Sequence, residues 1–394
     1  MLESRTSQLV FNLAKLFGFP IQLHWNKGIK KAQFHTTSFW FSLIRYSGAF
    51  LPSVAIFLLF ATNGGVASLF SLYTDRRFSI LDLTSTWILW SISGLQMTFL
   101  WVFYRQNSCH INAIIAEISI LSSSIASKRE QIGFPLSWRR LLWVQIIGVG
   151  ICIILATISI HLLCGTEPKC SLAFQWAFTT LYFGTLFLCV YSIHQLASNL
   201  FIYETLIETE QLLQSFNSWV NLQPFLHPSD LLQKSKSIVR LFSCIENRIG
   251  SIIFFEILCS MTVVIFGVFQ ATNINLALAQ TTFGDNELSK LLLGSSFVML
   301  GIISCTRYLP FFRSGHNITT EMKAVKVKIE DELAKRFDQF SPNQLWEFKQ
   351  VRENFGRPAA IQPLGLFDLN LSTAFATDGL LITYIVILIQ FKLG

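Results

Sequence analysis

TYIVILIQF, residues 383–391, lies almost at the C-terminal end of the chain and places one amide side chain, Gln390, in a run of large apolar residues. The apolar stretch extends back to residue 371. A helix over 371–391 would be about 31 Å long, which matches the hydrocarbon core of a bilayer. The segment therefore predicts a membrane-spanning helix, and the surroundings of Gln390 within it determine its role.

The rest of the chain has the composition of a membrane protein. Of its 394 residues, 52% are hydrophobic and only 13% are charged, whereas soluble domains carry about 25% charged residues. Apolar runs of about 20 residues occur at seven places: 38–62, 79–103, 140–163, 171–194, 249–272, 290–313 and 371–391. The predicted fold class is all-α with seven transmembrane helices. No cleavable signal peptide is expected, because Lys15 interrupts the first apolar run.

The distribution of lysine and arginine predicts the orientation. These residues concentrate in the N-terminal segment and in the loops after the second, fourth and sixth spans, whereas the other loops and the C-terminal end hold Arg76, Arg77, Lys169 and Lys392. Because cytoplasmic loops carry the excess of positive residues, we expect a cytoplasmic N-terminus and an extracellular C-terminus. This is the reverse of a G-protein-coupled receptor. The net charge of +7 is explained by these loops, so no nucleic-acid partner is expected.

Two long inner loops are predicted to be helical. Apolar residues recur every three or four positions from Met322 to Phe337. A second helix is expected to begin at Ser229 or Asp230, which can cap its first amides, and to continue into the fifth span. We therefore expect a helical cytoplasmic base that packs on itself or on other subunits.

Enzyme and cofactor signatures are absent from the sequence: it has no phosphate-binding glycine loop, no metal-binding histidine pair and no catalytic serine motif. No enzyme activity, metal or cofactor is expected. Cys164 and Cys170 flank a short loop predicted to be extracellular, where they form either a disulfide or two free thiols. The glycosylation sequons at Asn317 and Asn370 lie on the predicted cytoplasmic side and should be bare.

Three charged residues lie within the spans at one depth, about six or seven residues from the cytoplasmic end: Arg45, Glu256 and Arg307. A charge at mid-bilayer costs about 2.5 to 3.5 kcal/mol, so each needs a partner. We expect Glu256 to pair with Arg307 or Arg45. The alternative is that the two arginines extend to the nearby inner surface.

The outer halves of the spans carry aromatic and hydrogen-bonding side chains, the mixture that a small-molecule pocket needs. Aromatic residues also collect at membrane interfaces without any ligand, so both interpretations stay open. The ligand-binding candidates are Asp82, Thr84, Trp87, Trp90, His161, Gln175, Trp176, Thr180, Tyr182, Phe269, Gln270, Ser295 and Ser296.

Gln390 has three possible environments: lipid near the outer interface, its own helix bundle, or water. If the last helix surrounds a symmetry axis, several copies of Gln390 line a wet pathway and Ile387 and Phe391 border the same face. Large apolar side chains close such a constriction by excluding water. Ile387, Gln390 and Phe391 are therefore the candidate gate residues of an ion channel.

The same nine residues resemble a family motif. TYIVILIQF is similar to the pattern Thr-Tyr, five hydrophobic residues, Gln-Phe at the C-terminal end of insect gustatory receptors, and the inverted topology resembles that family as well. The resemblance implies a ligand-gated, non-selective cation channel of four identical or related subunits in the plasma membrane of sensory neurons. It implies further that Gln390 and Phe391 form the pore constriction and that Thr383 and Tyr384 support packing.

The resemblance also implies the division of the chain. Residues 1–37 form a cytoplasmic segment, 38–313 the first six helices with an outward-facing ligand pocket, 314–370 cytoplasmic anchor helices and 371–394 the pore-lining helix. Many sugar receptors of this family have TYE where this chain has Ile385, which leaves fructose-type and bitter-type tastants open. The alternatives are a receptor coupled to G proteins or a secondary transporter, although uninterrupted spans in odd number argue against the latter.

Overall fold

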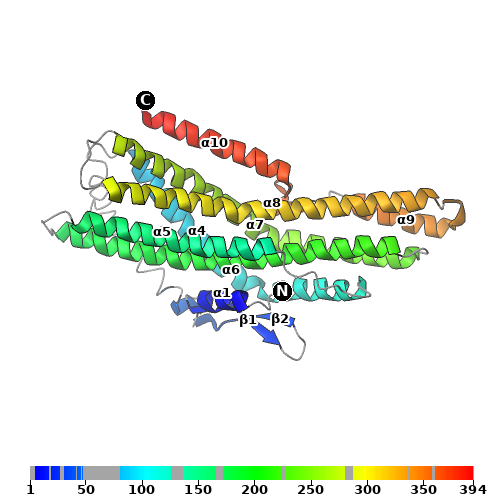
Figure 1. Cartoon of the computed structure of the whole chain (residues 1–394). Coiled ribbons are helices and arrows are strands. Elements are labelled where there is room, and N and C mark those ends of the chain that lie inside the picture. The colour runs from blue at the N-terminus through cyan, green and yellow to red at the C-terminus, as the bar shows by residue number, and fades with distance from the viewer. Residues whose placement is uncertain are drawn as a thin grey trace.

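Long, roughly parallel helices make up most of the structure, which is a computed structural model (Figure 1). It describes residues 5–16, 19–26, 31–40, 42–45, 47, 80–125, 136–165, 172–222, 227–279, 287–335, 337–356 and 360–393. The elements in chain order are α1 (Arg5–Leu16), β1 (Ile21–Asn26), β2 (Lys31–Thr36), α4 (Ile80–Ile125), α5 (Leu136–Gly165), α6 (Leu172–Leu222), α7 (Pro228–Ala279), α8 (Glu287–Lys335), η1 (Phe337–Gln339), α9 (Pro342–Gly356), η2 (Pro363–Gly365) and α10 (Leu371–Leu393).

Six of the seven predicted spans lie in these helices, namely in α4, α5, α6, α7, α8 and α10. The first, 38–62, lies mostly outside the described residues. By length and composition, four described helical segments are able to cross a bilayer: Ser91–Ile125, Pro228–Thr272, Gly294–Lys335 and Leu371–Gln390. A shorter apolar helix covers Trp143–Leu155 in α5. Most of the described chain is thus helical, with apolar helices of the kind that membrane proteins contain.

Four of the described helices are much longer than a bilayer requires, and the shortest of them, α4, has 46 residues. α6, α7 and α8 have 51, 52 and 49 residues, so each extends for more than about 70 Å. The expected helices of the inner loops are the continuations of these spans. α7 begins at Pro228, whose fixed φ suits the first helical position, and not after a cap at Ser229 or Asp230. The backbone amide of Leu231 donates to His227 at 3.2 Å instead.

The continued helices pack with α9 into a helical base, defined here as residues 205–222, 228–248, 315–335 and 342–356 (Figure 1). Most of the apolar residues that predicted these helices become buried, because a three- or four-residue period gives one apolar stripe; Phe337 is an exception, since it lies beyond α8 and is exposed. Leu231, Ile238 and Leu241 of α7 are fully buried. Phe216 stacks on Phe355 with ring centroids 5.8 Å apart, which attaches α9 to α6.

The N-terminal segment contains structure that the sequence analysis did not predict. β1 and β2 form an antiparallel hairpin in which Ile21 pairs with Thr36, and α1 packs against α6. Phe19, between α1 and β1, is fully buried and lies 5.1 Å from the ring of Tyr104 and 5.3 Å from that of His194. The N-terminal segment is therefore attached to the helix bundle and does not merely precede it.

Candidate functional site

α10 contacts the rest of the chain along one narrow face. It runs beside α7 and α8 at the edge of the bundle (Figure 1), and only 11% of its candidate span is buried. Ala374 and Leu381 are buried and Asp378 is half-buried. At about 100° per residue, Ala374, Asp378 and Leu381 lie within about 60° of one another around the helix. These residues define the bundle face of α10.

The candidate gate residues lie on the opposite side. Counted from Asp378, Ile387 is nine residues on and about 180° around the helix, Thr383 lies at about 140° and Gln390 at about 120°. All three side chains are exposed in the single chain, Ile387 by 38%. We name Thr383, Ile387 and Gln390 the outward face. Phe391 belongs to α10, but its side chain lies outside the described part of the structure.

The flanks of α10 are apolar and exposed as well. Phe375 is 71% and Ile382 is 63% exposed, and Tyr384 is also exposed. Thr383 donates its hydroxyl proton to the carbonyl of Gly379 within the same helix at 2.9 Å. The expected packing role of Thr383 and Tyr384 is thus not met by contacts within one chain. A helix with this surface requires lipid or another protein chain around it.

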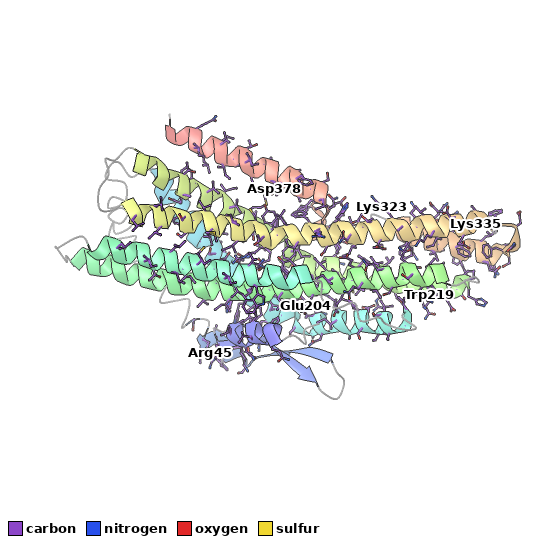
Figure 2. All side chains as sticks on the ribbon, viewed as in Figure 1. Arg45, Glu204, Trp219, Lys323, Lys335 and Asp378 are labelled. Carbon is purple, nitrogen blue, oxygen red and sulfur yellow. The ribbon has the colours of Figure 1, made fainter. Side chains whose placement is uncertain are left out.

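A hydrogen bond that the sequence analysis missed joins α10 to α8. The hydroxyl group of Tyr308 donates to Asp378 Oδ1 at 2.7 Å. The same hydroxyl lies 3.9 Å from Cys305 Sγ, and its single proton is better used at the carboxylate. Figure 2 shows Asp378 near the end of α10 that approaches α8. The carboxylate is a further charged residue of the predicted spans, and counting charges in 371–391 would have found it.

The segment before α10 is fixed at several points. The backbone amide of Leu369, which is buried, donates to the carbonyl of Ile361 at 2.9 Å. The ring of Phe367 lies 6.1 Å from that of Phe312 in α8. Asn370 caps α10, because its Oδ1 accepts the amide of Thr373 at 2.9 Å. The N-terminal end of α10 is therefore held against α7 and α8.

Glu256 and Arg307 belong to a buried polar network. Gln96 Nε2 donates to Glu256 Oε2 at 2.9 Å, and Gln195 Nε2 donates to Gln96 Oε1 at 2.9 Å. The guanidinium of Arg307 in turn donates to Gln195 Oε1, and Tyr191 donates its hydroxyl proton to Gln96 Oε1 at 2.5 Å. The network joins α4, α6, α7 and α8 in the middle of the bundle.

The expected direct pair of Glu256 with an arginine is therefore corrected. Among the described side chains Glu256 has no ion pair with Arg307 or Arg45, because the amides of Gln96 and Gln195 stand between the two buried charges. Arg45 instead donates from a guanidinium nitrogen to the carbonyl of Leu16 at 3.4 Å. Leu16 is the last residue of α1, where a cation also meets the negative end of the helix dipole.

The candidate pocket is described only in part. Gln270 and Phe269 of α7 are buried, Ser296 of α8 is buried and Ser295 is half-buried. α7 and α8 approach closely at Gly267, where a Cβ would lie 3.3 Å from the carbonyl oxygen of Phe297. This approach places Gln270 and Ser295 at about the same level of neighbouring helices. The remaining candidates lie in α4, α5 and α6, but their side chains are outside the described part: Asp82, Thr84, Trp87, Trp90, His161, Gln175, Trp176, Thr180 and Tyr182.

The cysteine and sequon predictions have different outcomes. Cys170, and the side chain of Cys164, lie outside the described residues, so the disulfide stays a prediction. The two sequon asparagines have structural contacts. Asn317 Nδ2 donates to Glu210 at 3.0 Å, and Asn370 is the cap of α10.

Comparison with known proteins gives a family match and a fold match. Residues 352–394 match the model of a family described as 7tm Chemosensory receptor. The whole chain resembles the structure of the insect olfactory receptor OR5 from Machilis hrabei in complex with eugenol, with a TM-score of 0.59, 12% sequence identity and coverage of 97% of this chain and 98% of that chain. A second structure of OR5 gives a TM-score of 0.57 at 12% identity, with 98% and 96% covered.

No curated protein matches the chain in sequence. At 12% identity, the likeness to OR5 shows a shared fold. The family match falls on α9, the segment before α10 and α10 itself, which is where the sequence resemblance was found. The predicted resemblance is thus confirmed at the level of insect chemoreceptors, odorant and gustatory receptors together.

Proposed function

Because its C-terminal segment and its fold identify this chain with the insect chemoreceptors, we propose that it is a ligand-gated, non-selective cation channel opened by a small-molecule tastant. Four copies, of this chain alone or with related receptors, surround one pore. α10 of each copy lines the pore, and the base holds the copies together in the cytoplasm. In this proposal each chain crosses the membrane seven times, with the N-terminus in the cytoplasm and the C-terminus outside.

The division of α10 into two faces carries this proposal. Its bundle face contains the residues that the chain itself buries, and its outward face contains Ile387 and Gln390, which the chain leaves exposed. In lipid, an amide on an uncovered face would lack partners. Around a fourfold axis, the Gln390 side chains instead face water and one another. Ile387 on the same face, and Phe391 at the next turn, then provide the apolar constriction.

The ligand pocket of this proposal opens to the outside between the first six helices. Gln270 and Ser295, on neighbouring helices, form its inner wall, and the tryptophans of α4 and α6 contribute aromatic faces. OR5 has been solved in complex with eugenol, which supports a small organic ligand for this chain as well. Sugars and ring-bearing bitter compounds both stack on tryptophan, so fructose-type sugars and bitter compounds are the two ligand classes proposed.

The topology is tested by small tags at each terminus in intact cells that express the full chain. Staining of a C-terminal tag without permeabilisation, together with a hidden N-terminal tag, supports the channel. The opposite staining points to the alternative, a receptor coupled to G proteins. The expected location is the plasma membrane of sensory neurons.

The channel is tested by current recording. Cells that express the chain are exposed to fructose and to a panel of bitter compounds, with G-protein signalling blocked. Ile387→Ala should change the ligand-free leak or the ion permeability, since it widens the proposed constriction. Ile382→Ala is the matched control, because this isoleucine is also exposed but lies about 140° away around α10. If Ile387→Ala and Ile382→Ala give the same leak and the same permeability, Ile387 does not line the pore.

A further inference from the structure

Asp378 is the one carboxylate of α10 and lies on its bundle face, and its hydrogen-bond partner is in another helix. Tyr308 of α8 donates its hydroxyl proton to Asp378 Oδ1 at 2.7 Å. Tyr308 is itself buried and packs edge to face on Phe312, with ring centroids 6.2 Å apart. A hydrogen bond to a carboxylate is about twice as strong as one between neutral groups. This contact therefore joins α10 to α8 by a stronger bond than a hydrogen bond between two neutral groups would provide.

The hydrogen bond lies within the bundle face of α10, between Ala374 and Leu381, which are both buried. On the N-terminal side of Asp378, Leu369 and Ala374 are buried. On the C-terminal side, Gly379 follows at once, and a Cβ there would meet no atom within 4 Å. Glycine lowers the stability of a helix interior by about 1 kcal/mol relative to alanine. Among the described side chains, Asp378 thus makes the last hydrogen bond from α10 to another helix before the segment that carries Ile387 and Gln390.

The residue before Tyr308 belongs to the buried polar network. Arg307 donates to Gln195 of α6, and its backbone carbonyl accepts the hydroxyl proton of Tyr203. Consecutive residues of α8 thus contact the network on one side and α10 on the other. A shift or rotation of α8 that alters the Arg307 contacts also moves the hydroxyl of Tyr308.

We propose that Tyr308 and Asp378 are positioning residues for the gate, which set the position of α10 and pass movements of the bundle to it through α8. This inference rests on the proposed channel function. Neither side chain lines the pore, since Asp378 lies about 180° from Ile387 around the helix. A change in either residue therefore alters how often the pore opens and leaves the open pore unchanged.

The test records ligand-free single-channel and whole-cell currents from cells that express the full chain, normalised to surface protein. Tyr308→Phe and Asp378→Leu each remove one partner and should shift the ratio of open to closed channels about ten-fold, in the same direction. The double variant should show the same shift as either single variant, because both remove one contact. Asp378→Asn keeps an acceptor oxygen for Tyr308 and should lie between the wild type and Asp378→Leu.

Tyr104→Phe is the matched control. It also removes the hydroxyl of a buried tyrosine, which donates to Ser198 Oγ at 3.1 Å between α4 and α6, away from α10. Its effect should add to that of Asp378→Leu without coupling.

Each outcome separates the two proposals. Suppose that the wild type carries current. If the effects of Tyr308→Phe and Asp378→Leu are then additive, or if Asp378→Leu changes the single-channel conductance, the positioning role is overturned and the channel stands. No current from the wild type with or without fructose and the bitter panel, despite normal surface protein, overturns both.

Discussion

Replacing Gly315 of α8 by alanine should displace the segment that leads into α10. A Cβ at this position would lie 2.1 Å from the carbonyl oxygen of Leu369 and 2.9 Å from its Cβ. Because real Cβ atoms essentially never approach another heavy atom closer than 3.0 Å, the oxygen has to move by about 0.9 Å. Leu369 is fully buried and hydrogen-bonded to Ile361, so it cannot move alone.

The expected destabilisation is that of an overpacked core, about 1 to 3 kcal/mol or more, since backbone atoms have to shift. The assay is the melting temperature of the full-length protein in detergent, followed by the loss of its monodisperse peak on size exclusion. Gly315→Ala should melt several degrees lower than the wild type. Gly379→Ala is the matched control. A Cβ there meets nothing and alanine favours the helix by about 1 kcal/mol, so this variant should melt no lower than the wild type. An unchanged melting temperature in Gly315→Ala would refute the close crossing.

Three further changes have a defined sign. Asn370→Ala should destabilise the fold by about 1 kcal/mol in the same melting assay, because it removes the cap of α10; equal melting of Asn370→Ala and wild type would contradict the cap. Gln96→Leu leaves the buried carboxylate of Glu256 without its amide donor and should cost about 1 to 3 kcal/mol or more, seen as loss of surface protein; a wild-type level would argue against the network. Burial raises the pKa of the Glu210 carboxyl, so the folded state favours the neutral form of this group. The stability that the neutral carboxyl contributes to the folded state is lost as the pH rises through the raised pKa. Glu210→Gln should therefore melt higher than the wild type at neutral pH, with a gain that shrinks on acidification, whereas exposed Glu330→Gln should not; a lower melting temperature for Glu210→Gln at neutral pH would refute this.

Local patterns predicted the helices well, because each depends on residues close in the chain. The three- or four-residue period from Met322 to Phe337 indicated the inner part of α8, although α8 ends at Lys335 and Phe337 lies in η1. The same period after residue 228 indicated that α7 continues from the base into its span. Both continuous helices are present. The hairpin of β1 and β2 was missed, although its alternating residues and the intervening Gly28 are a strand and turn signal.

The lateral contacts of the polar residues could not be predicted in the same way. Counting residues along each span placed Glu256 and Arg307 at one depth, but depth does not say which side chains lie between them. Gln96 and Gln195 come from two other helices, 160 and 112 residues away from the charges they bond. Tyr308 and Asp378 are likewise separated by 70 residues. Contacts of this kind depend on how each helix is rotated in the bundle.

The rotation of α10 also bears on why Gln390 is present. The bundle face is fixed by Ala374, Asp378 and Leu381, whereas the side chain of Gln390, on another side of α10, is exposed. A lipid-facing role would have favoured another aliphatic residue there, since lipid offers an amide no partner. A role inside the chain's own bundle would have required Gln390 on the bundle face. Water at an interface between copies is the environment that the proposed channel supplies.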